Sequence, residues 1–214
     1  MASEEKTKEN EEIVEESSKG EENKGRKREK AEKKPKEKEK VDIKREILSY
    51  VILLAIVAGV VLLINTFVLI NAKIPSGSME NTIMENDQIF GNRLAYKLGG
   101  EPQRMDIIIF KFPDDESKLF IKRIIGLPGE TVEIIDGRVY INGSNTSIDD
   151  SFCKETPQGD FGPYVVPEGK YFVMGDNRNH SNDSRLWTNK FVSKDQIVGK
   201  AVLRYWPLDK IGLL

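Results

Sequence analysis

The sequence predicts a mainly β protein: an antiparallel β sandwich or partly open barrel, preceded by one transmembrane helix and a disordered charged tail. Three observations support this prediction. Short apolar runs separated by Gly and Pro fill residues 71–214, an uncharged apolar run covers Ile47 to Ile70, and residues 1–46 are mostly Glu, Lys and Arg. The expected domain boundaries are therefore 1–46, 47–70 and 71–214.

The tail has almost no large apolar side chains, so it cannot bury enough surface to offset the entropy lost on ordering. Glu predominates in residues 1–23, and Lys and Arg predominate in residues 24–45. The basic half could be attracted to anionic lipid headgroups, by ~1 kcal/mol for each Lys or Arg, or the tail could simply be solvated. The acidic half repels phosphate, which argues against a nucleic-acid partner.

The run from Ile47 to Ile70 contains about 24 uncharged residues, roughly 36 Å as a helix, which is enough to span a bilayer with some tilt. A cleaved signal peptide has a shorter apolar core and small residues at the cut, unlike this run. We therefore expect a permanent anchor. Its basic flank is N-terminal, which predicts a single-pass cell-membrane protein with a cytoplasmic N-terminus and an extracytoplasmic domain over residues 71–214.

The outer domain has the composition of a β protein, and no long amphipathic helical pattern follows the apolar run. Asp136-Gly137 joins two β-rich runs within residues 131–141, which predicts a hairpin. A length of about 144 residues is enough for one core. Further strands are expected at residues 88–90, 106–112, 170–174 and 197–205.

A hydroxyl-rich turn, Ser76-Gly77-Ser78, follows the apolar run closely. The Gly permits a tight turn that can expose the Ser78 hydroxyl, although an ordinary loop is the alternative interpretation. A serine is a poor nucleophile until a base removes its proton, and His180 is the only histidine available. The single cysteine, Cys153, cannot form an intrachain disulfide, and no residue spacing indicates a metal or cofactor site.

Lys122 is the second candidate for the chemistry. On an alternating strand it shares one face with Phe120 and Ile124, and an apolar setting would lower the pKa of its amine. A neutral lysine can act as a general base, whereas a lysine that snorkels at a strand edge cannot. A polar loop over residues 175–185 follows a predicted strand, and an ion pair of Asp183 with an Arg of this loop could fix its shape.

Together these segments resemble the bacterial type I signal peptidases, membrane-anchored serine proteases that remove signal peptides from exported proteins. IPSGSME matches the family's nucleophile segment, FIKRIIGLPGE its lysine segment and GDNRNHSNDSR its support segment, in the family's order. RMDIIIF and GKAVLRYWP also match, so the resemblance runs from Ile74 to Pro207. The compact domain without a cysteine pair is similar to the shorter Gram-positive form.

The resemblance implies a Ser/Lys dyad in which Ser78 is the nucleophile and Lys122 is the general base. The Ser76 hydroxyl and the Ser78 backbone N–H would form the oxyanion hole, where one donor is typically worth about 3–4 kcal/mol in the transition state. Ser181 would orient the lysine amine. The support loop would be held by Asp183 and Arg185.

The resemblance also implies small apolar pockets that accept Ala and exclude larger side chains, which gives a preference for Ala-x-Ala before the cut. We expect the substrate chain to bind extended, beside a strand edge. The pocket for the residue before the cut would be lined by Ile74, Pro75, Met79, Ile83, Phe120 and Ile121. The shallow pocket two residues upstream would be lined by Ile89 and Ile109.

Four positions depart from the family pattern. Asn81 stands where Pro is usual, Asn86 and Met105 stand where Gly is usual, and Asn179 stands where Asp is usual. Asn readily adopts a left-handed backbone, whereas Met rarely does. None of the four belongs to the expected dyad.

Other functions fit less well. Self-cleaving repressors use similar Ser/Lys chemistry but are soluble and bind DNA, and eukaryotic-type signal peptidases place His where this chain has Lys122. A non-catalytic membrane-tethered β domain that binds exported chains is the alternative from another class, but the presence of Ser78, Lys122 and Ser181 argues against it. The expected partners are exported preproteins and membrane lipids, without nucleic acid and without an obligate protein partner.

Overall fold

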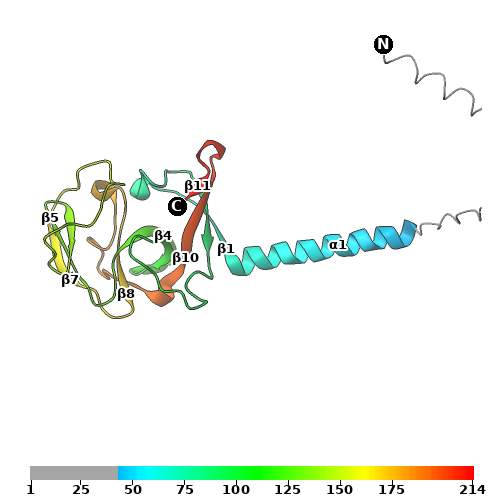
Figure 1. Cartoon of the computed structure of the whole chain (residues 1–214), viewed down its shortest axis with the longest axis horizontal. Coiled ribbons are helices and arrows are strands. Elements are labelled where there is room, and N and C mark those ends of the chain that lie inside the picture. The colour runs from blue at the N-terminus through cyan, green and yellow to red at the C-terminus, as the bar shows by residue number, and fades with distance from the viewer. Residues whose placement is uncertain (1–42) are drawn as a thin grey trace, which may run out of the picture. The chain divides into compact units, whose positions relative to one another are not determined.

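The computed structural model describes residues 43–214, so the predicted tail lies outside the described residues except for its last four positions (Figure 1). Those four residues belong to helix α1 (Ile43–Leu63), which continues as a π-helical turn, η1 (Ile64–Val68). The helix therefore begins four residues before the predicted apolar run. The last two residues of that run, Leu69 and Ile70, belong to strand β1 instead.

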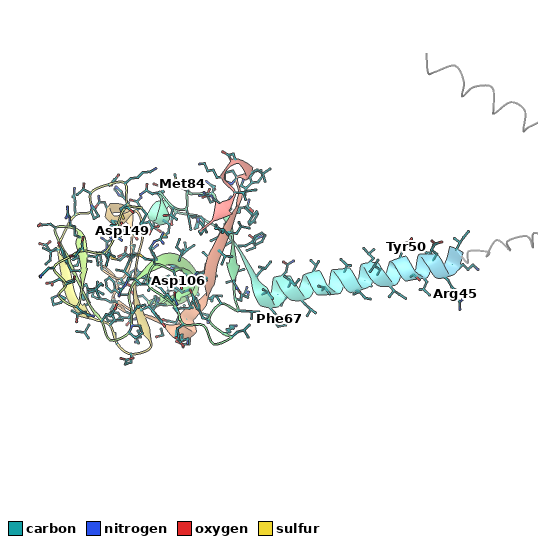
Figure 2. The ribbon with its side chains drawn as sticks, viewed as in Figure 1. Arg45, Tyr50, Phe67, Met84, Asp106 and Asp149 are labelled. Carbon is teal, nitrogen blue, oxygen red and sulfur yellow. The ribbon has the colours of Figure 1, made fainter. Side chains whose placement is uncertain are left out.

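Helix α1 and turn η1 form a segment long and apolar enough to cross a membrane. Their large side chains are exposed, including Tyr50 and Phe67, which project outward from the helical segment (Figure 2). A helix that is apolar all round and has no buried residue is typical of a segment solvated by lipid. The segment is therefore a possible membrane span.

Residues 69–214 form two antiparallel sheets, which confirms the predicted mainly β fold. The larger sheet has the order β1-β2-β10-β3-β4-β8-β9, with β11 also paired to β10, and the smaller has the order β6-β5-β7. Helical structure after η1 is limited, in the described chain, to short 3-10 turns. The strands are β1 (Leu69–Lys73), β2 (Gln88–Asn92), β3 (Ile107–Phe112), β4 (Asp115–Gly126), β5 (Thr131–Ile135), β6 (Arg138–Ile141), β7 (Phe161–Val165), β8 (Lys170–Met174), β9 (Val192–Ser193), β10 (Ile197–Trp206) and β11 (Gly212–Leu213).

Strand β3 is buried on both faces, which explains its continuous apolar sequence. Ile107 and Ile109 belong to one hydrophobic cluster, whereas Ile108 and Phe110 belong to a second cluster on the opposite face. The second cluster also contains Trp187, whose ring centroid lies 6.0 Å from that of Phe110. A third cluster joins β4 and β8 to the smaller sheet, which lies beside β8 in Figure 1.

The predicted hairpin forms between β5 and β6. Asp136 and Gly137 both have positive φ, 48° and 75°, as a two-residue turn of this kind requires. Asn86 and Met105, which replace the family's usual Gly, also have positive φ, 67° and 75°. The strained backbone of Met105 is held on both sides, because its N–H donates to the Ile124 carbonyl at 2.9 Å and its carbonyl accepts from Arg123 Nη1 at 2.9 Å. Met105 therefore adopts the positive φ that the family's usual glycine would provide at this position.

We expect the substitution Phe110→Ala to lower the free energy of unfolding by about 3–5 kcal/mol, because it empties a fully buried ring position. Urea unfolding of the detergent-solubilised chain, followed by tryptophan fluorescence, measures this effect. Leu208→Ala is the control: its side chain is 67% exposed, and the change should stay within about 0.5 kcal/mol. Equal stability of the two variants would contradict the packing described for β3.

Candidate active site

Ser78 lies in a 3-10 turn, η2 (Gly77–Met79), which follows β1. The turn is closed by a hydrogen bond from the Glu80 N–H to the Gly77 carbonyl at 3.0 Å. Met79 is fully buried and belongs to the same hydrophobic cluster as Ile83, whose N–H donates to the Met79 carbonyl at 2.8 Å. Burial of Met79 therefore anchors the turn and leaves its neighbour Ser78 at the surface of a cleft.

Lys122 projects from β4 to Ser78. Its Nζ donates to Ser78 Oγ at 2.6 Å and to the Ile121 carbonyl at 3.0 Å. The residue is only 4% exposed, and Nζ lies 5.5 Å from the centroid of the Phe120 ring. The predicted apolar setting of this lysine is therefore confirmed, and the snorkelling alternative is wrong.

Burial lowers the pKa of Lys122 from 10.5 to about 8, because desolvation penalises the charged amine. The carboxylates of Asp183 and Asp176 oppose this effect and keep the pKa from falling further. With this pKa, roughly a tenth of the amine is neutral at pH 7, and the neutral fraction rises with pH. A neutral amine within hydrogen-bond distance of a serine hydroxyl can accept its proton.

The polar loop after β8 is held by buried ion pairs. Asp183 is fully buried, accepts a hydrogen bond from the Gly175 N–H at 3.0 Å and pairs with Arg185, whose Nε donates to it at 2.8 Å. Arg185 Nη2 also donates to the Arg178 carbonyl at 2.6 Å. The predicted ion pair thus forms with Arg185, and each charged group has several partners.

Two further arginines tie this loop to the rest of the domain. Arg123, on β4, makes a two-pronged contact with Asp176, at 2.8 Å from Nε and 2.7 Å from Nη2. Arg178 makes a similar contact with Asp150, at 2.8 Å and 3.2 Å. Such paired geometry fixes direction as well as distance. The loop therefore has little freedom to move relative to β4.

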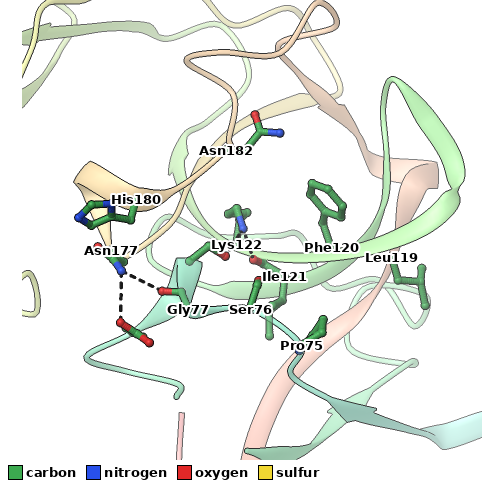
Figure 3. A pocket seen from close by; sticks show the side chains of 12 residues that line it. Pro75, Ser76, Gly77, Leu119, Phe120, Ile121, Lys122, Asn177, His180 and Asn182 are labelled. Carbon is green, nitrogen blue, oxygen red and sulfur yellow. Dashed lines mark hydrogen bonds between the residues drawn. The ribbon is translucent and has the colours of Figure 1, made fainter. Parts of the chain in front are cut away.

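The loop also contacts the Ser78 turn directly. The Asn177 N–H donates to the Ser78 carbonyl at 3.1 Å, and Asn177 Nδ2 donates to the Gly77 carbonyl at 3.0 Å (Figure 3). A Cβ at Gly175 would lie 2.2 Å from Ser181 Oγ and 2.3 Å from the Ser78 carbonyl oxygen, so only glycine fits there. The roles of Asn177 and Gly175 could not be predicted from the sequence, because neither contact has a local sequence signal.

Ser181 is buried close to this contact but does not make the expected hydrogen bond. Its Oγ has no hydrogen-bond partner within residues 43–214, whereas the Lys122 amine donates to Ser78 and Ile121 instead. A buried hydroxyl without a partner costs about 1–3 kcal/mol. The structure therefore brings Ser181 to the site without showing the predicted support of Lys122.

A cleft of about 500 Å³ opens at Ser78 and Lys122 (Figure 3). It includes Ser76, whose side chain is exposed, and three of the residues expected to bind substrate: Pro75, Phe120 and Ile121. Six further residues line the cleft without having been predicted from the sequence as site residues. These are Gly77, Glu80, Leu119, Asn177, His180 and Asn182.

The other residues expected to line substrate pockets do not line this cleft. They belong to a single buried hydrophobic cluster, in which each is at most 3% exposed. Ile121 packs against this cluster and also lines the cleft, so it forms the boundary between the two. The members concerned are Ile74, Met79, Ile83, Ile89 and Ile109.

Cys153 is unsuited to act as a nucleophile. Burial raises the pKa of its thiol to about 11, so the thiol stays protonated near neutral pH. It lies in a separate hollow of about 510 Å³ with Asp149, Asp150 and Arg138. Cys153 therefore supplies no nucleophile to the cleft that contains Ser78 and Lys122.

Comparison with known proteins agrees with the family resemblance of the sequence. The model of the family described as "Signal peptidase, peptidase S26" matches residues 47–206. This match covers the apolar helix, the Ser78 turn, the Lys122 strand and the support loop. It supports the sequence resemblance over most of the chain.

Curated relatives carry the same family name. A probable signal peptidase I-2 of Synechocystis is 41% identical over 71% of this chain and 69% of that protein. Signal peptidase I P of Bacillus subtilis subsp. natto is 35% identical over 78% of this chain and 94% of that protein. A crystal structure of a signal peptidase I from Enterococcus faecalis V583 aligns at 41% identity with a TM-score of 0.40, covering 47% of this chain and 96% of that chain. On the family match and the identities to the two curated relatives, the chain belongs to the signal peptidase family, peptidase S26, and is a serine endopeptidase that cleaves signal peptides.

Proposed function

We propose that Ser78 and Lys122 form the catalytic dyad of this signal peptidase. Ser78 Oγ attacks the scissile carbonyl carbon while Lys122 Nζ takes the hydroxyl proton. The lysine then passes this proton to the leaving amine as the C–N bond breaks. Water attacks the acyl-enzyme, Lys122 takes a proton from that water, and the proton returns to Ser78 as the ester bond breaks. The 2.6 Å contact between a buried amine and Ser78 Oγ carries the proposal.

The oxyanion formed in this attack would be bound by the Ser76 hydroxyl and the Ser78 backbone N–H. Ser76 is extended, with φ −145°, and it directly precedes the turn that carries Ser78. Both donors therefore come from one short segment, which is anchored by buried Met79 on one side and by Asn177 on the other. Asp183 and Arg185 would keep the support loop in place, and the support of Lys122 by Ser181 stays a prediction.

The signal peptide would bind extended along the apolar part of the cleft, against Pro75, Phe120 and Ile121. We interpret the buried cluster behind Ile121 as a rigid floor that keeps the pockets small, so that Ala fits and larger side chains overpack. Ile74 and Ile109 belong to this floor. They would therefore set the specificity for Ala-x-Ala indirectly.

The segment from Ile43 to Val68 would anchor the protein in the membrane, with the N-terminus in the cytoplasm and the β domain outside. Only nine residues separate Val68 from Ser78, so the anchor would hold the nucleophile near the outer membrane surface, where a cleavage site emerges. Exported preproteins would be the substrates, lipid would contact the anchor, and no obligate protein partner would be needed. None of the comparisons supports a non-catalytic function.

The substitutions Ser78→Ala and Lys122→Ala should each abolish cleavage, because one removes the attacking oxygen and the other removes the base. Cleavage of a preprotein with an Ala-x-Ala site by the full-length protein measures this effect. Lys118→Ala is the matched control, since Lys118 lies on the same strand with a 63% exposed side chain. Near-normal turnover by either dyad variant would refute the assignment.

The substitution Ser76→Ala should lower kcat by ~10²–10³-fold with little change in KM, because it removes a donor that acts mainly in the transition state. Steady-state kinetics on the same preprotein separates the two parameters. An unchanged kcat would remove Ser76 from the oxyanion hole.

The pH dependence of kcat/KM should follow the protonation of Lys122. With a pKa of about 8, the amine is increasingly protonated as the pH falls, and a protonated amine cannot accept the Ser78 proton. We expect kcat/KM to fall about tenfold per pH unit below this pKa. Tryptophan fluorescence over the same range checks that the fold persists, and a rate that stays flat into strong acid would contradict a neutral-lysine base.

A further inference from the structure

The cleft has two chemically different ends, with Ser78 and Lys122 between them. Figure 3 shows Pro75, Leu119 and Phe120 on one side of Lys122, and Asn177 and His180 on the other. The first group is apolar. The second group is polar, and it includes Glu80, which is hydrogen-bonded to Asn177.

The carboxylate of Glu80 is held against the Ser78 turn. Its Oε2 accepts a hydrogen bond from Asn177 Nδ2 at 3.4 Å. Its Oε1 is packed so closely against Gly77 that a Cβ at position 77 would lie only 2.5 Å from it. Glycine at position 77 therefore makes room for this carboxylate. The Glu80 side chain thus faces the cleft in a defined position rather than extending into solvent.

Within residues 43–214, this carboxylate forms no ion pair with a cationic side chain. Across residues 43–214, the ion pairs of Lys and Arg side chains all involve other acidic groups. The Lys122 amine bonds Ser78 and Ile121 rather than Glu80. The polar end of the cleft therefore holds a carboxylate that no ion pair among residues 43–214 neutralises.

The direction of the substrate follows from the proposed function, on which this inference rests. The small apolar residues before the cut would occupy the apolar end, and an extended chain advances about 3.3 Å per residue. The first residues of the mature chain would then pass the polar end, beside Glu80. A fixed anion there attracts a basic side chain and repels an acidic one.

We propose that Glu80 determines specificity by selecting the charge of the first two residues after the cut. It favours substrates with Lys or Arg there over substrates with Asp or Glu. Glu80 takes no part in the bond-breaking steps. Its effect is on the ratio of kcat/KM values between substrates.

The test compares two preproteins with the same Ala-x-Ala site, one with Lys and one with Glu at the two positions after the cut. We expect the full-length enzyme to prefer the Lys substrate by about fivefold to tenfold in kcat/KM at low salt. The preference should shrink at about 0.5 M salt, because exposed charges are then screened. Glu80→Gln should bring the ratio close to one, and Glu80→Lys should reverse it.

Glu155→Gln is the matched control. Glu155 also accepts a hydrogen bond from an amide of the support loop, Asn179 Nδ2 at 3.2 Å, but it lies outside the cleft. This variant should keep the wild-type ratio. An equal ratio in the wild type and Glu80→Gln would overturn the inference, as would complete loss of cleavage in Glu80→Gln, because the carboxylate would then serve the reaction itself. Failure of the proposed dyad can be told apart from failure of this inference, because cleavage would then survive the substitution Ser78→Ala.

Discussion

The burial of one amine is the constraint on which the rest of this structure depends. Lys122 is 4% exposed, and an isolated ammonium ion in that position would be strongly disfavoured, so its pKa falls to about 8. The neutral form can then share a proton with Ser78 at 2.6 Å. Burial on this scale needs a closely packed strand, and β4 provides it because it pairs with β3, which is buried on both faces.

The charges around the amine limit how far its pKa falls. Asp183 and Asp176 raise it, but each is already paired with an arginine, Arg185 and Arg123, so their field at Nζ is reduced. The arginines therefore act on the electrostatics and the rigidity of the site together. Glu80 differs, because its carboxylate faces the cleft and forms no ion pair among residues 43–214, so its field acts on what enters.

The fold also explains why the nucleophile lies where it does. Strand β1 begins one residue after the apolar segment ends, and the Ser78 turn follows β1 after three residues. The sheet thus joins the end of a possible membrane span to the active-site turn through one short edge strand. Little chain remains to be ordered between them, which favours a fixed position of Ser78 relative to β1.

The apolar span, the Asp136-Gly137 hairpin and the main strands could be predicted from the sequence, because they depend on local periodicity and turn chemistry. The motif order also pointed to Ser78 and Lys122 together. Which isoleucines face the cleft and which, such as Ile89, are buried behind it depends on the tertiary packing, since alternation along a strand does not say what covers each face. Likewise, the contacts of Asn177 with the Ser78 turn and of Glu80 with Asn177 join segments about 100 residues apart, and no local pattern encodes such a pairing.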